Sequence, residues 1–231
     1  MLTPLPARPP LRRCASYLDA LQQYEVVIET KRSACGGDSV AVASSHRDLG
    51  RVLALQRRFD AAEEHYGAAV RLCAQLLGES HPNTACALTD LAAVLREQGN
   101  FEAAEAFAQR AVASLRAGVG AEDVSTATAL YNLAGLAKRQ SKWPAAEEAY
   151  TEALRIFRGK LGDGAGETAD TFYQIGCLHR KRNEVVRARE AFAAAAAAYE
   201  ACYGKADKRV LEAGKRAAAM AEKMRALPRA S

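Results

Sequence analysis

Residues 123–164 read DVSTATALYNLAGLAKRQSKWPAAEEAYTEALRIFRGKLGDG, and this stretch aligns without gaps to three other parts of the chain. The pattern recurs 42 residues earlier at 81–122, 42 residues later at 165–206, and again at 39–80. One glycine column keeps this spacing throughout: Gly36, Gly78, Gly120, Gly162 and Gly204. Self-similarity at a fixed period of a few tens of residues is typical of a solenoid, in which each unit packs on its neighbours.

Each repeat has the periodicity of two helices. In the first half, Leu130 and Leu133 lie on one amphipathic stripe, and in the second half Tyr150 and Phe157 do the same. Pro144 follows a break between the halves and suits the first turn of a helix. The glycine near the end of each repeat suits a left-handed residue just past a helix C-terminus. The sequence therefore predicts two antiparallel helices per repeat, joined by a tight turn.

Three repeat positions carry a small residue in every copy. Small side chains let two helix backbones approach closely, so we expect these positions to mark helix crossings. Large apolar positions, such as Leu49, Leu91, Leu133 and Ile175, should fill the space around them. The small positions are Ala62, Ala104, Ala146 and Ala188; Ala69, Ala111, Ala153 and Ala195; and Gly50, Ala92, Ala134 and Gly176.

The repeats divide nearly the whole chain. We expect a solenoid over 17–226, made of a half repeat at 17–38, full repeats at 39–80, 81–122, 123–164 and 165–206, and a closing helix at 207–226. Residues 1–16 hold four of the seven prolines and no acidic residue, which predicts an extended or disordered tail. Residues 227–231 form a second short tail.

This pattern resembles the tetratricopeptide (TPR) repeat, in which a hydrophobe, a leucine and a small residue precede Ala–aromatic–Ala in the second helix. The length of 42 residues, Leu161-Gly162 at a repeat end, His81-Pro82, and the Tyr-Asn-Leu-Ala of 131–134 are similar to the kinesin light chain and nephrocystin type. The resemblance implies an all-α solenoid of antiparallel helix pairs wound into a right-handed superhelix. It also implies a non-catalytic protein-binding module.

No pattern in the chain indicates catalysis, a metal or a cofactor. The four histidines include no HExxH motif, and the six cysteines include no CxxC pair. Gly162 to Gly166 follows a predicted helix and lacks the Gly-Lys-Ser/Thr ending of a phosphate-binding loop. Acidic pairs such as Glu63-Glu64 and Glu147-Glu148 are predicted to lie on a solvated face. We therefore expect no enzyme activity and no cofactor.

Charge is unevenly distributed. The net charge is +5, and from Lys205 onward the chain holds eight Lys/Arg and three Asp/Glu, so the excess lies in the closing helix and tail. Aromatic residues do not alternate with these charges, which argues against nucleic-acid binding. No apolar run approaches the roughly 18 residues that a membrane span needs, so a membrane partner is not expected either.

The resemblance places the first helix of each repeat along a concave groove. Arg96, Lys138 and Arg180 recur at one repeat position, so we predict that they form a basic ladder suited to an acidic, extended peptide. A solvated charged face is the alternative interpretation of these residues. The expected groove residues are Arg47, Arg51, Asp90, Arg96, Tyr131, Asn132, Lys138, Tyr173, Gln174 and Arg180.

Two protein-binding hypotheses follow, beside a third, nucleic-acid binding through the basic closing helix, against which the placing of the aromatic residues argues. In the first, the protein is a cytoplasmic adaptor that binds a protein or peptide partner, acidic in character, in the concave groove. In the second, it is a scaffold subunit of a larger cytoskeletal or ciliary (axonemal) assembly, bound through its outer faces and tails. The repeat pattern predicts the fold in both cases and does not name the partner.

Overall fold

A computed structural model describes residues 26–34 and 37–226 of the chain. Within these residues the chain is all-α, with no strand, as the sequence predicted. The predicted tails at 1–16 and 227–231, and the first part of the half repeat at 17–25, lie outside the described residues, whereas 26–34 are helical. The other helices are α2 (Val40–Leu55), α3 (Phe59–Leu77), α4 (Pro82–Gln98), α5 (Phe101–Gly118), α6 (Val124–Arg139), α7 (Trp143–Leu161), α8 (Gly166–Lys181), α9 (Val185–Tyr203) and α10 (Lys208–Ala226).

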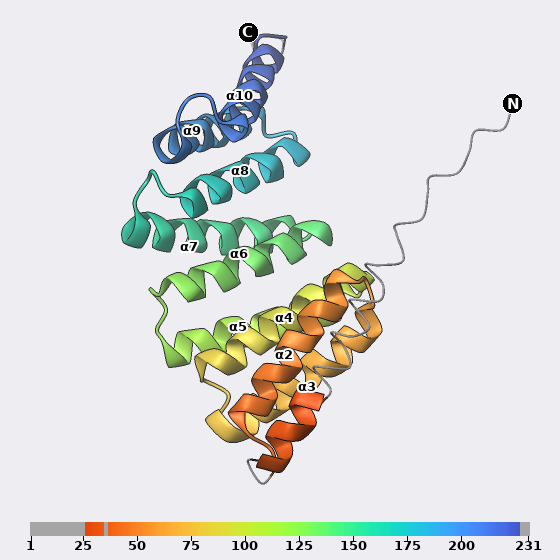
Figure 1. Cartoon of the computed structure of the whole chain (residues 1–231). Coiled ribbons are helices and arrows are strands. Elements are labelled where there is room, and N and C mark those ends of the chain that lie inside the picture. The colour runs from red at the N-terminus through yellow and green to blue at the C-terminus, as the bar shows by residue number, and fades with distance from the viewer. Residues whose placement is uncertain (1–25, 35–36, 227–231) are drawn as a thin grey trace, which may run out of the picture.

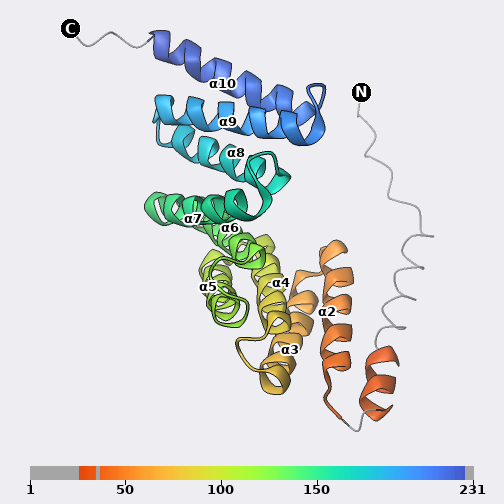
Figure 2. The same ribbon diagram turned by 90° about the vertical axis from the view of Figure 1, so that its left-hand side faces the viewer.

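The helices form a stack of antiparallel pairs in chain order, which Figures 1 and 2 show from two sides. We call α2, α4, α6, α8 and α10 the A helices, and α3, α5, α7 and α9 the B helices. Each A helix packs against the B helix that follows it, and each B helix packs against the next A helix. This architecture is the predicted all-α solenoid, and its core runs along the whole stack.

Small residues mark the helix crossings, as the sequence predicted. Ala62, Ala104, Ala146 and Ala188 are all 0% exposed, and the second alanine column is at most 1% exposed. The glycines of the third column face aromatic rings: a Cβ on Gly176 would lie 2.8 Å from the Phe192 ring, and one on Gly50 would lie 3.1 Å from the Tyr66 ring. The packing of A on B therefore depends on the absence of larger side chains.

The turns differ from the sequence prediction in one respect. The repeat-end glycines have a positive φ, but Gly78 (φ 91°, ψ 162°) and Gly162 (φ 89°, ψ 170°) combine it with an extended ψ. They therefore occupy a region open almost only to glycine, rather than the left-handed helical region that was predicted. A positive φ near 60–85° occurs instead in the turn between A and B helices, at Arg57, Gly99, Ser141 and Asn183.

A buried threonine ties three of the four full repeats to the glycine before them, and the sequence analysis missed this contact. The hydroxyls of Thr84, Thr126 and Thr168 donate to the carbonyls of the repeat-end glycines at 2.8, 2.8 and 2.9 Å. All three side chains are fully buried. Their spacing of 42 residues was the available signal.

One acidic column was assigned wrongly from the sequence. Glu63 and Glu147 are half-buried rather than solvated, whereas Glu64 and Glu148 are exposed as expected. Gln98 Nε2 donates to Glu63 at 2.8 Å, Gln140 Nε2 donates to Glu105 at 2.7 Å, and Arg182 forms an ion pair with Glu147. These bonds connect the end of each A helix to the preceding B helix, a long-range contact that helical periodicity does not reveal.

Candidate functional site

The ten groove residues predicted from the sequence come from the A helices α2, α4, α6 and α8. We call the surface formed by the A helices the A-helix face. The structure divides these residues into an N-terminal group on α2 and α4 and a C-terminal group on α6 and α8. The two groups differ in how their charges are satisfied.

Charges in the N-terminal group neutralise one another. Arg47 Nη2 lies 2.8 Å from Asp90 Oδ2, which links α2 to α4. Although burial alone would lower the pKa of Arg47, the charge of Asp90 and the hydrogen bond to it raise that pKa above its usual value. Arg51 pairs with Asp48 one turn away, and Arg96 Nη2 lies 2.9 Å from Glu97 Oε1. This half of the A-helix face therefore offers few unpaired cations.

A small cavity lies between α4, α5 and α6. Its volume is about 60 Å³, and its lining includes Thr89, Arg96 and Asn132 together with apolar atoms of neighbouring alanines. The cavity has room for one or two water-sized groups and not for a cofactor. Asn132 is half-buried in its wall.

In the C-terminal group, Lys138 does not project freely as the ladder hypothesis required. Its ammonium donates to the amide oxygen of Gln174 on α8, and Nζ lies 5.8 Å from the centre of the Tyr150 ring. Burial lowers the pKa of this ammonium. Lys138 therefore links α6 to α8, and Arg96, Lys138 and Arg180 are not equivalent.

The two tyrosines are half-buried and held edge-on against aromatic residues of the B helices. Tyr131 meets Tyr150 with ring centroids 5.5 Å apart, and Tyr173 meets Phe192 at the same distance. Arg216 of α10 stacks on Tyr173, with its guanidinium carbon 5.1 Å from the ring centre. The sequence analysis did not include Arg216, although it occupies the repeat position of Asn132 and Gln174, one copy beyond Gln174.

Seven cations on the A helices of the C-terminal half are exposed: Arg139 on α6, Arg180 and Lys181 on α8, and Lys208, Lys215, Lys223 and Arg225 on α10. Lys223 donates to Asn183, whereas the side chains of the other six form no hydrogen bond or ion pair with any residue in 26–34 or 37–226. Arg180 was predicted as a groove residue, and Arg139 and Lys181 were placed beside it. Lys215 was missed as a groove residue, although it shares the repeat position of Tyr131 and Tyr173.

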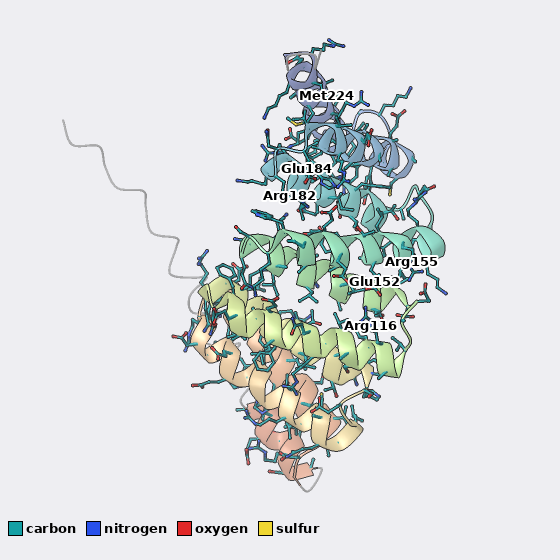
Figure 3. The ribbon with its side chains drawn as sticks, turned by 180° about the vertical axis from the view of Figure 1, so that it is seen from behind. Arg116, Glu152, Arg155, Arg182, Glu184 and Met224 are labelled. Carbon is teal, nitrogen blue, oxygen red and sulfur yellow. The ribbon has the colours of Figure 1, made fainter. Side chains whose placement is uncertain are left out.

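The B-helix side has a different charge arrangement, seen from behind in Figure 3. Arg116 on α5 and Glu152 on α7 meet at 2.7 Å, and Arg155 on α7 reaches Glu122 at 2.6 Å. Arg110 pairs with Glu79 in the same way. These cations hold neighbouring repeats together and are engaged within the chain.

The described part of the chain shows no group of three or more His, Cys, Asp or Glu residues that could hold a metal ion. Its cysteines at 73, 86, 177 and 202 are free thiols, and Cys73 is buried in the core. None of its helices is both long and apolar enough to cross a membrane.

Comparison with known proteins supports the repeat assignment. A tetratricopeptide repeat family model matches residues 42–117 and 125–201, more than half of the chain. A search of curated protein sequences finds no match.

Several solved structures share the fold at low sequence identity. BtubC (BKLC) from P. vanneervenii is 21% identical with a TM-score of 0.70, and 97% of each chain is covered. A putative kinesin light chain from P. anserina with nearly identical TPR-like repeats is 16% identical with a TM-score of 0.69, covering 82% of this chain and 90% of that one. MamA is 19% identical with a TM-score of 0.59, covering 82% and 92%. The chain belongs to the tetratricopeptide repeat family, and its solenoid has a fold like that of kinesin light chain-like repeats.

Proposed function

We propose that this protein is a non-catalytic interaction module that binds an acidic, extended segment of a partner protein along the C-terminal half of the A-helix face. Tetratricopeptide repeats are in general non-catalytic and bind protein partners, which supports the first part of the proposal. The observation that carries the second part is the set of exposed, unpaired cations on α6, α8 and α10, which includes Arg139, Arg180, Lys181 and Lys215.

These unpaired cations differ from many arginines elsewhere on the surface, which are paired with acidic residues. Arginines on α2 and α4 are engaged by Asp48, Asp90 and Glu97, and several on the B-helix side are engaged by glutamates of neighbouring repeats. An unpaired cation attracts an anion without first losing a partner, so an incoming carboxylate gains more here than at these paired arginines. Binding is therefore directed to α6, α8 and α10.

Tyr131 and Tyr173 add an apolar component within the same half of the face. Each ring is half-buried and fixed against a B-helix aromatic ring, so little conformational freedom is lost when a ligand packs on it. Exposed ion pairs contribute only about 0–1 kcal/mol each, so the affinity must come from several cations acting together with the tyrosines. An extended segment can reach all of them, because the A helices lie side by side along the stack.

The test is fluorescence anisotropy with a fluorescein-labelled peptide in which glutamate alternates with glycine. Wild-type protein should bind it, and added salt should weaken binding steeply because screening shortens the reach of each charge. The double variant Arg139→Glu/Arg180→Glu should reduce affinity by about tenfold or more, since two attractions become repulsions.

The matched control is Arg71→Glu/Lys160→Glu, which changes the net charge equally. Both residues are exposed cations on B helices and form no ion pair with another described residue. This control should bind nearly as well as wild type. Equal losses in the two double variants would mean that only overall charge matters, and undiminished binding by the A-helix variant would exclude the proposed site.

A further inference from the structure

The first turn between an A and a B helix is unlike the other three. We call residues 55–59, which join α2 to α3, the Arg57 turn. Its positive-φ position holds Arg57 (φ 61°), whereas the equivalent positions hold Gly99, Ser141 and Asn183. A left-handed backbone is unfavourable for a residue with a long side chain, while glycine and asparagine accept it readily. Nothing in the local packing requires an arginine here.

Three side chains of the turn are exposed, those of Leu55, Arg57 and Arg58, whereas Gln56 and Phe59 are half-buried. The side chains of Arg57 and Arg58 form no ion pair or hydrogen bond with any residue that the structure describes. Arg58 is the N-cap of α3 and makes no side-chain capping bond. Leu55 is 80% exposed, the largest value among the exposed large hydrophobic residues of the described chain. Two free guanidinium groups therefore lie close in sequence to one uncovered aliphatic side chain.

A shallow cleft opens beside the turn, lined by Arg57, Arg58, Phe59, Asp60, Ala61, Glu97 and Gln98. Its two acids already have donors: Gln98 Nε2 lies 3.0 Å from Asp60, and Arg96 lies 2.9 Å from Glu97. The guanidinium carbon of Arg57 lies 5.5 Å from the Phe59 ring centre, which keeps the charge at the mouth of the cleft. Arg96 balances the charge of Glu97, whereas Asp60 accepts from a neutral amide, so the cleft has two unpaired guanidinium groups against one uncompensated carboxylate.

We propose that the Arg57 turn is a second protein-binding site, which takes a carboxylate followed by an aliphatic side chain in a partner segment. Arginine can bind a carboxylate through two parallel hydrogen bonds, and Leu55 would cover the aliphatic side chain. Residues 1–16 of the chain contain no acidic residue, so that segment cannot supply the carboxylate itself. Local strain is often kept where a side chain is needed for function, which accounts for arginine at a position suited to asparagine. The proposal does not depend on the A-helix face.

The test uses a fluorescein-labelled peptide in which glutamate-leucine pairs are separated by glycine. Wild-type protein should bind it with a measurable change in anisotropy, and Arg57→Asn/Arg58→Gln should weaken binding by about tenfold or more. The same variant should keep or raise the Tm, because asparagine accepts the backbone that Asn183 already adopts. Leu55→Ser should weaken binding of this peptide and leave binding of a leucine-free glutamate-glycine peptide at its wild-type level.

Two controls separate this site from others. Ser141→Asn alters the equivalent turn two repeats on and should leave binding unchanged. The Arg139→Glu/Arg180→Glu variant should keep the part of the peptide affinity that comes from the Arg57 turn. Adding Arg57→Asn/Arg58→Gln to that variant should therefore lower the affinity for the glutamate-leucine peptide further. The proposal is overturned if wild type does not bind the glutamate-leucine peptide, if the Arg57→Asn/Arg58→Gln variant binds it at full strength, or if affinity falls only in proportion to lost stability.

Discussion

The contact between Gly176 and Phe192 predicts that one added methyl group destabilises the fourth repeat. Gly176 lies inside α8, where alanine would ordinarily be favoured over glycine by about 1 kcal/mol. A Cβ there would lie 2.8, 2.9 and 3.0 Å from three atoms of the Phe192 ring, and that ring is 0% exposed. Overpacking of this kind costs about 1–3 kcal/mol. Gly176→Ala should therefore destabilise the protein by about 1 kcal/mol.

Two other helical glycines provide matched controls. A Cβ on Gly67 would meet only the flexible end of Arg71 at 3.6 Å, so Gly67→Ala should stabilise by about 0.5–1 kcal/mol. Gly50 is intermediate, with three Tyr66 ring atoms at 3.1 Å, and Gly50→Ala should be close to neutral. Thermal unfolding followed by circular dichroism should rank the Tm values Gly67→Ala above Gly50→Ala above Gly176→Ala. A Tm for Gly176→Ala as high as that for Gly67→Ala would refute the account of the helix crossing.

Three further predictions concern the polar contacts between repeats. Thr126→Val should lower the free energy of unfolding by about 1 kcal/mol, because it removes a buried hydrogen-bond donor to Gly120 O. Thr128→Val changes an exposed position and should leave that free energy nearly unchanged, and urea unfolding measures both variants. Gln56 Nε2 is buried without a partner in the described chain, so Gln56→Met should leave the stability unchanged or raise it. Gln140→Met should lower the stability because it removes a hydrogen-bond donor from Glu105. A lower Tm for Gln56→Met than for Gln140→Met would contradict this prediction. Burial alone would raise the pKa of Glu105, but hydrogen bonds from Lys142 and Gln140 lower that pKa below its ordinary value of 4.5. The ionised Glu105 therefore stabilises the folded protein fully above pH 4.5, and this stabilisation is lost as the pH falls through the lowered pKa. Glu105→Gln should therefore lower the Tm at neutral pH and lower it much less at about pH 3. An equal fall in Tm at both pH values would contradict the ion pair between Glu105 and Lys142.

Features set by repetition could be predicted from the sequence. The columns of Ala146 and Ala153 indicated the helix crossings, because only a small residue at every copy fits two backbones in contact. Pro144 falls in the first turn of α7, as expected. These are local or strictly periodic features, which a single sequence can reveal.

Features that depend on pairing between repeats could not be predicted. Glu147 looked like a surface residue because helical periodicity places it beside exposed Glu148, and only the stacking brings Arg182 to it. Lys138 and Arg180 occupy equivalent positions in the sequence, yet Gln174 engages only Lys138. The acidic column therefore proved partly buried, and the groove hypothesis now rests on a different set of cations.

The most direct test of the proposed function is backbone amide chemical-shift mapping during titration with the glutamate-glycine peptide. Amides of α6, α8 and α10 around Arg139, Arg180 and Lys215 should shift progressively, and those of α3, α5 and α7 should stay in place. Salt should reverse the shifts, because the contacts are charge-driven. Saturable shifts confined to the B helices, or no saturable shifts at low salt, would contradict binding along the C-terminal half of the A-helix face.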